Sequence, residues 1–548
     1  MATTSPRSTN ESVSHRVPMV VQVGIAGSRH LIPEELTDPK KRKEFLDQVG
    51  AALTQELGSL RSRLKLREQH FFCALSQAAI GVDALAIEVT EALGWRHRIM
   101  LPRLPEEYFS AESSDGVPDF TDEERSACEP LLNKPHVIEV DVVSTAFDRD
   151  DRFTEVNHQM ARICDVVIMV VSKGTTGGKG GTRDLEQRVE RRQVPHLLLE
   201  VEGDLDSGVG LKTVRDELGG FDPPVAPHEL DHANDAGQRL CQNDCSAEEL
   251  RGCLSAVARD TADKLKDGYL SRVRRVLVAH AAATGLATLA ILLARYGDGA
   301  EAKVVKQVVG WILGIEIVTL ALGLWWHLKL HRDHDTAKWA MNRLVEQVVD
   351  SAHAMRELPT ALRHYFVLPL PRSMRPLLRT LNVLHLEEVK QRPPGDPPVM
   401  EDYLRERIDR QIRYNEKTQR ESQGELAWMN RLFIFFSALA IAMTSAKFLK
   451  TAGLLSVPSS MKDVFGDSCG FLAIWAPVVA AGALSWAIAG DLKGRAAVCG
   501  EMLGFLKRYR ERNESIKDGP IFHRVALEAE ERLLGESATW YARRAFID

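Results

Sequence analysis

The chain has 548 residues, of which 44% are hydrophobic and 27% are charged, and its formal net charge is −6. This composition excludes a wholly disordered chain, a collagen-like chain and a small disulfide scaffold, and the small net charge argues against a basic nucleic-acid binder. Only 8 residues are cysteines, so we expect the soluble parts to lie in a reducing, cytoplasmic setting. Residues 1–16 lack the apolar stretch of a secretory signal and are expected to form a disordered tail.

Residues 17–202 are predicted to form an α/β domain of Rossmann-like type. The apolar runs at 20–25, 70–75 and 165–171 are typical of buried strands, and each is followed by a loop of small residues and then by a helical segment. Strands that alternate with helices predict a parallel sheet with right-handed crossovers. Ligands of such sheets bind at the carboxyl ends of the strands, where these loops lie.

The three loops predict a site for a phosphate-bearing ligand, because small residues expose backbone N–H groups and helix N-termini attract anions. Arg29, Lys179 and Arg183 are the candidate anion partners, and the alternative for each is a solvated surface cation. The full set of predicted binding residues is Gly24, Gly27, Ser28, Arg29, Ser76, Gly81, Asp83, Lys179, Gly180, Gly181, Thr182 and Arg183.

Several motifs follow one another in this region: GIAGSR at 24–29, Ser76 with GVDAL at 81–85, IMLP at 99–102, and CDVV at 164–167 with GGT at 180–182. Through these motifs the region resembles the SLOG family over about 17–201. SLOG proteins are Rossmann-like and include LOG phosphoribohydrolases, the DNA-processing proteins of transformation and the sensor region of melastatin-type TRP channels. The resemblance implies that the ligand is a nucleotide or an NAD-derived signal.

The loop that would carry catalysis departs from the family pattern. LOG-type hydrolases are similar in using a PGGxGTxxE loop, whose glutamate helps to cleave an N-glycosidic bond, whereas residues 177–186 read GGKGGTRDLE. The proline is absent, a glycine is added, and the acid falls one position late at Glu186, which rotates its carboxylate by about 100° on a helix. Asp184 is the other candidate, with a shorter side chain. We therefore favour a sensor without turnover, and Glu186 and Asp184 are catalytic candidates only if the domain is an enzyme.

Residues 203–260 are predicted to form a linker rich in Pro, Gly and Asp. A group of five potential metal ligands falls in or near it, namely His228, His232, Cys241, Cys245 and Cys253. Their spacing matches no standard zinc site, so we predict neither a metal nor a cofactor. We also predict no nucleic-acid partner.

Four apolar stretches in the second half, at 276–294, 308–328, 432–449 and 471–490, predict membrane spans. Each has about the 20 residues that a bilayer crossing requires. The alternative is buried helices of a large soluble protein, but such helices normally carry a polar stripe that these stretches nearly lack. Lysine and arginine flank the inner ends of both hairpins, so the positive-inside rule places both termini and residues 329–430 in the cytoplasm.

The spans divide into two similar units, 261–360 and 401–548, joined by a predicted linker at 361–400. Each unit has two spans and then a charged helix, which an internal duplication would explain. The second unit resembles the SLATT module over about 400–548. The resemblance lies in residues 405–414 before the hairpin and in Glu528, Glu531, Leu534, Glu536 and Trp540 after it. SLATT modules are regarded as pore-forming or membrane-disrupting effectors of bacterial conflict systems, which implies a multi-pass protein of the bacterial inner membrane.

Two features of the spans bear on a pore. Glu316 is a carboxylate within the second span, and such a residue is a functional candidate; the alternative is a protonated, hydrogen-bonded side chain in a helix interface. Gly310 and Gly314 form a GxxxG motif, which permits close helix contact and oligomers. Four spans enclose too little space for a wide pore, so we expect a homo-oligomer.

The two halves together predict a membrane effector of an anti-phage, abortive-infection system. Its SLOG domain would sense a nucleotide second messenger, of the cyclic ADP-ribose or cyclic oligonucleotide type, made by a separately encoded enzyme, and the spans would then open or disrupt the lipid bilayer. The alternative is a membrane-tethered SLOG enzyme of the phosphoribohydrolase or NAD-cleaving type. A constitutive transporter is disfavoured because the spans are few.

Overall fold

The structure is a computed structural model, and it divides into two compact units. The first comprises Met1–Cys253 and Met355–Asp396, and the second comprises Leu254–Ala354 and Pro397–Asp548. The described residues are 17–33, 35–110, 120–144, 146, 148–173, 178–227, 247–295, 302–332, 334–356, 358, 365, 368, 370–391, 400–452, 454–455, 458, 462–516 and 519–545. The predicted tail at 1–16 and four of the five potential metal ligands, His228, His232, Cys241 and Cys245, lie outside them.

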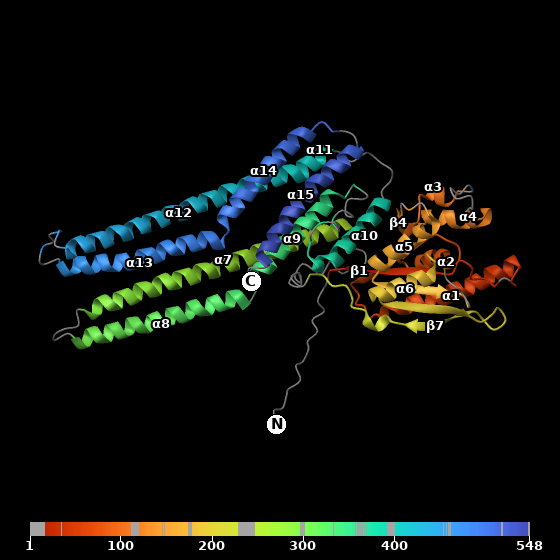
Figure 1. The fold of residues 1–548 in the computed structure, drawn as a ribbon, viewed down its shortest axis with the longest axis horizontal. Coiled ribbons are helices and arrows are strands. Elements are labelled where there is room, and N and C mark those ends of the chain that lie inside the picture. Colours follow the sequence, from red (N-terminus) through yellow and green to blue (C-terminus); the bar gives the residue numbers. More distant parts are fainter. Residues whose placement is uncertain are drawn as a thin grey trace, which may run out of the picture. The chain divides into compact units, whose positions relative to one another are not determined.

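The described part of the first unit contains a seven-stranded sheet in the order β4-β3-β2-β1-β5-β6-β7 (Figure 1). All neighbouring pairs are parallel except β6 and β7, which are antiparallel. The strands are β1 (Met19–Gly27), β2 (His70–Ser76), β3 (Arg96–Leu101), β4 (Val137–Val142), β5 (Val166–Val171), β6 (His196–Glu202) and β7 (Gly210–Asp216). The predicted α/β fold is confirmed, and β7 lies beyond the predicted boundary at residue 202, within the expected linker.

Helices cover both faces of this sheet, which explains the continuous apolar run of β5. Val166, Ile168 and Val170 pack with α1 and α2, whereas Val167 and Met169 pack with α5 and α6. The helices are α1 (Pro39–Arg63), α2 (Val82–Ala92), α5 (Arg149–Ile163) and α6 (Thr182–Arg192); the short α3 (Pro105–Tyr108) and α4 (Asp122–Cys128) lie between β3 and β4.

The helix α1 shows how the local sequence defines these elements. Asp38 is its N-cap, and the carboxylate accepts a hydrogen bond of 2.9 Å from the backbone N–H of Lys40. Pro39 occupies the first turn, where its missing N–H costs nothing. The buried residues recur every three or four positions, at Phe45, Val49, Leu53, Leu57 and Leu60, so one face of the helix covers the sheet.

A distant segment completes the first unit. The helix α10 (Arg375–Gln391) lies within 361–400, where we expected a linker, and packs on the sheet through Val383 and Leu386. The backbone N–H of Val20 donates a 3.0 Å hydrogen bond to Oγ1 of Thr380. Because Val20 stands near the start of β1, α10 covers the amino-terminal edge of the strands, away from the loops predicted to bind a ligand.

The second unit is helical. Its helices are α7 (Ala247–Ala294, which begins in the first unit), α8 (Ala302–Arg332), α9 (Asp335–Ala354), α11 (Met400–Tyr403), α12 (Asp409–Thr451), α13 (Lys462–Ala489), α14 (Leu492–Asn513) and α15 (Gly519–Ala545), with a π-helical turn at Leu404–Ile408. Four helical stretches, which cover α7, α8, α12 and α13 to within one residue, are long and apolar enough to cross a membrane. The predicted spans at 276–294, 308–328, 432–449 and 471–490 fall on these helices, the last overshooting α13 by one residue.

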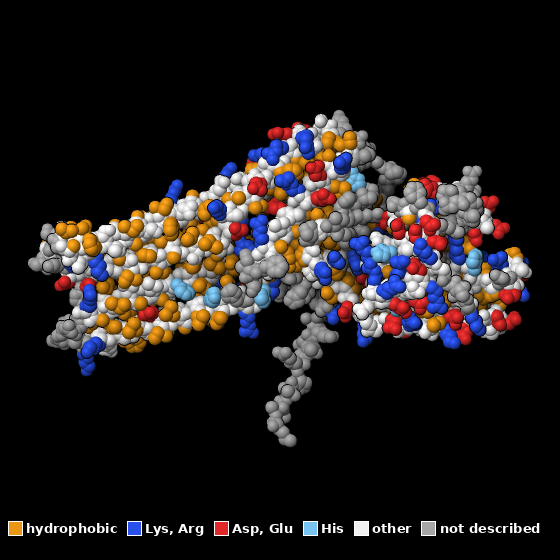
Figure 2. Space-filling view, viewed as in Figure 1, with side chains coloured by type: hydrophobic (Ala, Val, Ile, Leu, Met, Phe, Trp, Pro, Cys, Tyr) orange, Lys and Arg blue, Asp and Glu red, His pale blue; other side chains and the backbone are white. Residues whose placement is uncertain are grey.

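The apolar faces of these helices are exposed within the chain. Only 6–22% of the residues in the most apolar windows are buried, and Trp311, Ile317, Ile434 and Ile488 are each more than half exposed. Figure 2 shows hydrophobic side chains gathered over the same helices. Helices in the core of a soluble protein would be buried, so the structure favours a membrane protein.

The two apolar hairpins, α7–α8 and α12–α13, contact each other. Nε1 of Trp475 on α13 donates a 3.0 Å hydrogen bond to the carbonyl oxygen of Ala281 on α7. At the loop ends of the hairpins, Arg295 and Asp467 form a salt bridge of 2.7 Å. The two hairpins therefore pack as one helical group within the unit.

Candidate functional site

The predicted site lies where the strand order reverses. The chain runs from β1 outward through β2, β3 and β4, and then returns to place β5 on the other side of β1. Loops leave such neighbouring strands in opposite directions, which creates the crevice where α/β sheets bind ligands. Here the backbone N–H of Ser28 donates to the carbonyl oxygen of Val170 at 2.9 Å, and the N–H of Ser172 donates to Oγ of Ser28 at 3.1 Å. Ser28 thus joins the first and third predicted loops.

Two predicted site glycines are required by backbone packing. A Cβ on Gly27 would lie 2.2 Å from the carbonyl oxygen of Val170 and 2.4 Å from Cγ2 of Val82. Gly81 has a φ of +83°, and a Cβ there would lie 2.3 Å from the carbonyl oxygen of Ser28. These glycines allow α2 to begin directly against the loop that follows β1. Gly24, also in the predicted set, lies inside β1, where a Cβ would be 2.9 Å from Sγ of Cys164.

Asp83 is the most unusual group at this site. It lies in the first turn of α2 with 8% of its surface exposed, and among the described residues its Oδ1 has no hydrogen-bond partner. Burial raises the pKa of the carboxyl to about 7, although the nearby charge of Arg29 acts in the opposite direction. The guanidinium of Arg29 lies 5.0 Å from the ring centre of Phe120. A buried, unsatisfied acceptor next to a cation is a polar group available to a ligand.

Ser76 lies deeper than we expected for a ligand-binding residue. Its side chain is fully buried, and its hydroxyl donates a 2.8 Å hydrogen bond to the carbonyl oxygen of Gln77. The same oxygen lies 2.9 Å from Nε2 of His97, whose Nδ1 lies 2.8 Å from Oγ1 of Thr90. Burial lowers the pKa of His97 to about 3, so this imidazole is neutral. Ser76 therefore anchors the carboxyl end of β2 from inside the fold, and its contact with a ligand stays a prediction.

The third loop leads into α6 with a free N-terminus. Gly180 has a φ of +79°, Gly181 is the N-cap, and no hydrogen bond from a side chain caps the described start of the helix at Thr182. Asn157 supports the turn by donating a 3.1 Å hydrogen bond to the carbonyl oxygen of Gly181. Residues 174–177 of the loop lie outside the described part of the chain. The uncapped N–H groups and the helix dipole make this end of α6 suitable for an anion.

The two candidate cations of this loop already have acidic partners. Nζ of Lys179 lies 2.5 Å from Oδ1 of Asp151, and both side chains are about half exposed. Nη1 of Arg183 lies 2.7 Å from Oε2 of Glu186. Exposed pairs of this kind contribute at most about 1 kcal/mol, so an incoming phosphate can compete for Lys179.

The two candidate acids face opposite sides of α6. Asp184 faces α5, where its Oδ2 accepts hydrogen bonds from Asn157 at 3.1 Å and from Arg188 at 2.9 Å. Glu186 is buried, and Arg215 of β7 lies 3.5 Å from its Oε1. Burial raises the pKa of Asp184, but the hydrogen bonds from Arg188 and Asn157 outweigh this effect and hold it below the usual value. An ionised Asp184 that accepts two hydrogen bonds is poorly suited to donate a proton in catalysis.

Sequence reasoning missed Asn157 and Phe120, which contact the site residues Gly181 and Arg29. Neither lies near those residues in the sequence, and no motif marks them. Among the described residues, no group of three His, Cys, Asp or Glu side chains is arranged to hold a metal ion.

The polar groups of the apolar helices lie as follows. Glu316 on α8 is partly exposed, and no salt bridge joins it to another described residue. His280 on α7 approaches α8 near Gly323, because a Cβ placed on Gly323 would lie 3.6 Å from Cε1 of His280. Gly310 and Gly314 have no atom within 4 Å of a Cβ position, so their face of α8 is open within the described chain.

In comparisons with known proteins, no family model and no curated protein matches this chain. The structure itself defines the class: a chain with a Rossmann-like α/β unit and four helices capable of crossing a membrane.

Proposed function

We propose that this chain is a membrane effector that is controlled by a phosphate-bearing, nucleotide-derived signal. One observation carries the proposal, namely that a single chain combines two features. The first is a strand-order reversal flanked by the N-termini of α2 and α6, neither of which has a side-chain cap in the described chain. The second is a set of four apolar helices whose faces are exposed. The first feature is the arrangement by which α/β sheets bind nucleotides. The second needs a bilayer or further copies of the chain to cover it.

Binding without turnover is the mode that the site supports. The two acids that might act in hydrolysis, Asp184 and Glu186, face opposite sides of α6 and are each engaged by arginine. Neither is poised as a general acid. Asp83, by contrast, presents a buried oxygen without a hydrogen-bond partner in the described chain, and a ligand hydroxyl or amino group would satisfy it.

The SLOG and SLATT resemblances extend the proposal to a biological setting. The signal is then a second messenger of the cyclic ADP-ribose or cyclic oligonucleotide type, supplied by a separate enzyme during phage infection. The response is pore formation or disruption of the bacterial inner membrane, with both termini of the chain in the cytoplasm. The open face of α8 at Gly310 and Gly314 supports assembly into a homo-oligomer.

A ligand controls such a response only through different affinities for two states of the protein. A shift of the population from 1:99 to 99:1 requires a difference of about 5.5 kcal/mol. The ligand therefore has to gain contacts in the active state that it lacks in the resting state.

The test measures membrane potential in liposomes that contain the full chain, as candidate messengers are titrated. We expect depolarisation at saturating messenger, and a weaker response for Arg29→Gln, which removes the cation beside Asp83. Lys212→Gln, which removes an exposed cation on β7, is the matched control and should respond normally. An intact potential with every messenger would contradict the proposal.

The alternative of a membrane-tethered phosphoribohydrolase or NAD-cleaving enzyme makes a different prediction. The purified chain would release a free base or a ribose phosphate, and Glu186→Ala would abolish the release. Substrate that stays intact at saturating protein excludes this alternative.

A further inference from the structure

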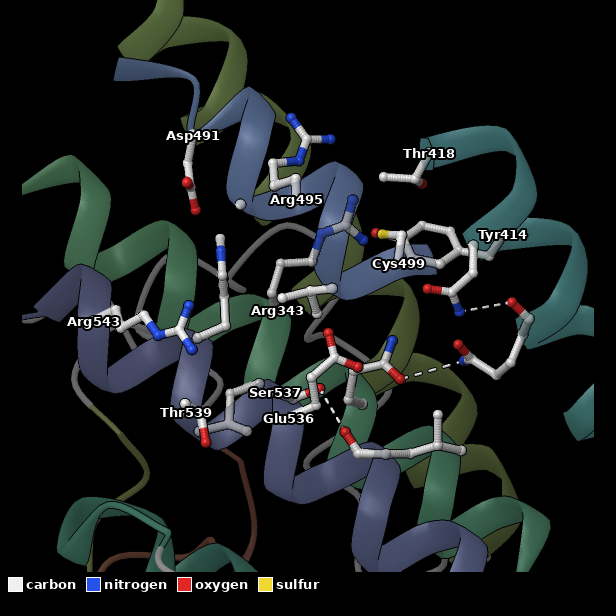
Figure 3. A pocket seen from close by; sticks show the side chains of 18 of the residues that line it. Arg343, Tyr414, Thr418, Asp491, Arg495, Cys499, Glu536, Ser537, Thr539 and Arg543 are labelled. Carbon is white, nitrogen blue, oxygen red and sulfur yellow. Dashed lines mark hydrogen bonds between the residues drawn. The ribbon is translucent and has the colours of Figure 1, made fainter. Parts of the chain in front are cut away.

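The charged helices of the second unit enclose a cavity that is separate from the α/β site. Its volume is about 170 Å³, and its walls come from α7, α9, α12, α14 and α15 (Figure 3). Four cations from four different helices line it: Lys266, Arg343, Arg495 and Arg543. Among the described residues, two acids line the same space, Asp491 and Glu536.

Three of these cations form no salt bridge with any described residue. Arg343 has two acidic partners, Glu346 at 2.6 Å and Asp263 at 2.8 Å. In contrast, Lys266, Arg495 and Arg543 form no salt bridge within 4.0 Å with any described residue. The four cations outnumber the two acids in this space, so the net charge of its described lining is positive, and an anion there would reduce the repulsion among the cations.

The start of α14 adds to the positive field of the cavity. Asp491 is its N-cap with a φ of +48°, and its side chain makes no capping hydrogen bond. A Cβ on Gly494 would lie 2.4 Å from Oδ1 of Asp491, so the carboxylate of Asp491 lies beside the first turn of the helix. Arg495 follows in the first turn of a helix of 22 residues. The helix dipole and the Arg495 guanidinium therefore act on the same space, opposed there by the carboxylate of Asp491.

Glu536 opposes an anion less than an ordinary carboxylate would. Burial raises the pKa of Glu536 to about 7; Arg532 and Arg543 lower it, and Glu501 on α14 raises it further. At neutral pH the group is therefore partly protonated, and a protonated carboxyl donates a hydrogen bond to an anion. Tyr414 and Trp540 also line the cavity and add aromatic walls.

We propose that this cavity binds a phosphate group, carried either by a lipid headgroup or by a free phosphate compound. Three cations that form no salt bridge with described residues, a helix N-terminus and two aromatic side chains match a phosphate with an organic substituent. The cavity begins immediately after α13, since Asp491 lies between the end of that apolar helix and the start of α14. That position is within reach of lipid headgroups if α13 crosses a bilayer. The site does not depend on a ligand in the α/β unit.

The experiment compares a double variant with a charge-matched control in the full chain. Arg495→Gln with Arg543→Gln removes two cations of the cavity. Lys493→Gln with Arg508→Gln removes two exposed cations of α14 that do not line it. In the first arm, native mass spectrometry counts the phosphatidylglycerol retained by chains released from nanodiscs of mixed phosphatidylcholine and phosphatidylglycerol. In the second arm, tripolyphosphate is titrated into the detergent-solubilised chain and followed by calorimetry.

We expect the wild type and the control to bind phosphatidylglycerol, tripolyphosphate or both with equal affinity. The double variant should bind the same probe at least about tenfold more weakly. Weaker binding by the double variant in the lipid arm alone identifies a lipid headgroup as the ligand of the cavity. Weaker binding in the tripolyphosphate arm alone identifies a free phosphate compound as the ligand. Equal binding by the double variant and its control in both arms overturns the proposal. Folding is checked by thermal unfolding without ligand, where loss of the repulsion should leave the double variant at least as stable as the wild type. Should the double variant fail to fold, Lys266→Gln alone, on α7, gives the same comparison.

Discussion

Arg407 and Glu530 form a salt bridge of 2.9 Å whose two side chains are only 3% and 0% exposed. The hydroxyl of Tyr403 donates a 2.9 Å hydrogen bond to Oε1 of the same glutamate. The three residues join α11 and the π-helical turn before α12 to α15, that is, the segments on either side of the second hairpin. Burying such a pair adds little net stability, but removal of one partner leaves an uncompensated charge.

Glu530→Ala should therefore destabilise the helical unit by about 3 kcal/mol, because Arg407 stays buried and keeps only the more distant carboxylate of Asp350, at 4.0 Å, as a counter-charge. Thermal unfolding of the solubilised full chain, followed by circular dichroism at 222 nm, measures the effect. Glu528→Ala changes an exposed glutamate on the same helix and should leave the midpoint nearly unchanged. Equal midpoints for the two variants would contradict the structural role of the pair.

Thr380→Val should weaken the attachment of α10 to the sheet by about 1–3 kcal/mol, because the buried N–H of Val20 loses its acceptor. Hydrogen exchange of a peptide that covers β1 reports the change directly, as faster exchange near its amino end. Thr380→Ser keeps the hydroxyl and should retain most of the protection. If both variants exchange like the wild type, Thr380 does not hold Val20 in solution.

Asp83→Asn should stabilise the α/β unit at alkaline pH. The pKa of Asp83 is about 7 in the fold against 3.8 for an ordinary aspartate. Between these values the folded chain keeps a proton that the unfolded chain loses, so stability falls as the pH rises through this window. Above pH 7, the ionisation of Asp83 lowers the free energy of unfolding by about 4 kcal/mol, and the neutral amide of Asn removes this loss.

The measurement is the difference in unfolding midpoint between the variant and the wild type, taken at pH 4.5 and at pH 8. The difference should be small at the lower pH and large at the higher one. Asp47→Asn, at an exposed position on α1, is the control and should show no such trend. A difference that does not depend on pH would mean that Asp83 is ionised in the fold.

Anion binding in the proposed phosphate cavity should weaken as the pH rises through 7, because Glu536 ionises there. The charged groups that act on Glu536 are Arg532 and Arg543 on its own helix and Glu501 on α14, and Glu536 itself acts on the thiol of Cys499. Sulfate is the suitable probe, since its charge is constant between pH 6 and pH 8. Glu536→Gln should bind sulfate with nearly the same affinity across this range. If the affinity of this variant falls with pH as steeply as that of the wild type, Glu536 is not the titrating group.

Local patterns predicted the parts of the fold that depend on neighbours in the sequence. The apolar run of β5 and the four apolar stretches can be recognised in the sequence. A strand buried between two helical layers needs continuous apolar residues, and so does a helix that crosses a membrane. The attachment of α10 has no such signal, since Thr380 and Val20 are 360 residues apart.

The candidate site divides in the same way. Small residues at three strand ends located the loops, and Gly27 and Gly81 lie at the predicted edge of the sheet. Residue type alone did not show that Ser76 points inward to His97, or that Asp83 lacks a partner within the described chain. Those properties depend on side-chain direction and on residues brought together by the whole sheet.

The α/β unit is made of two separate stretches of chain, and this has a practical and a mechanical consequence. The first apolar hairpin is inserted between them, so both of its ends are covalently tied to one folded body, whereas the second hairpin is joined to that body by a single connection. A fragment cut at residue 202 would lose α10 and β7 and expose the apolar side chains of Val20 and Ile138. A fragment for ligand binding should instead replace the inserted hairpin with a short tether and keep the chain through residue 391.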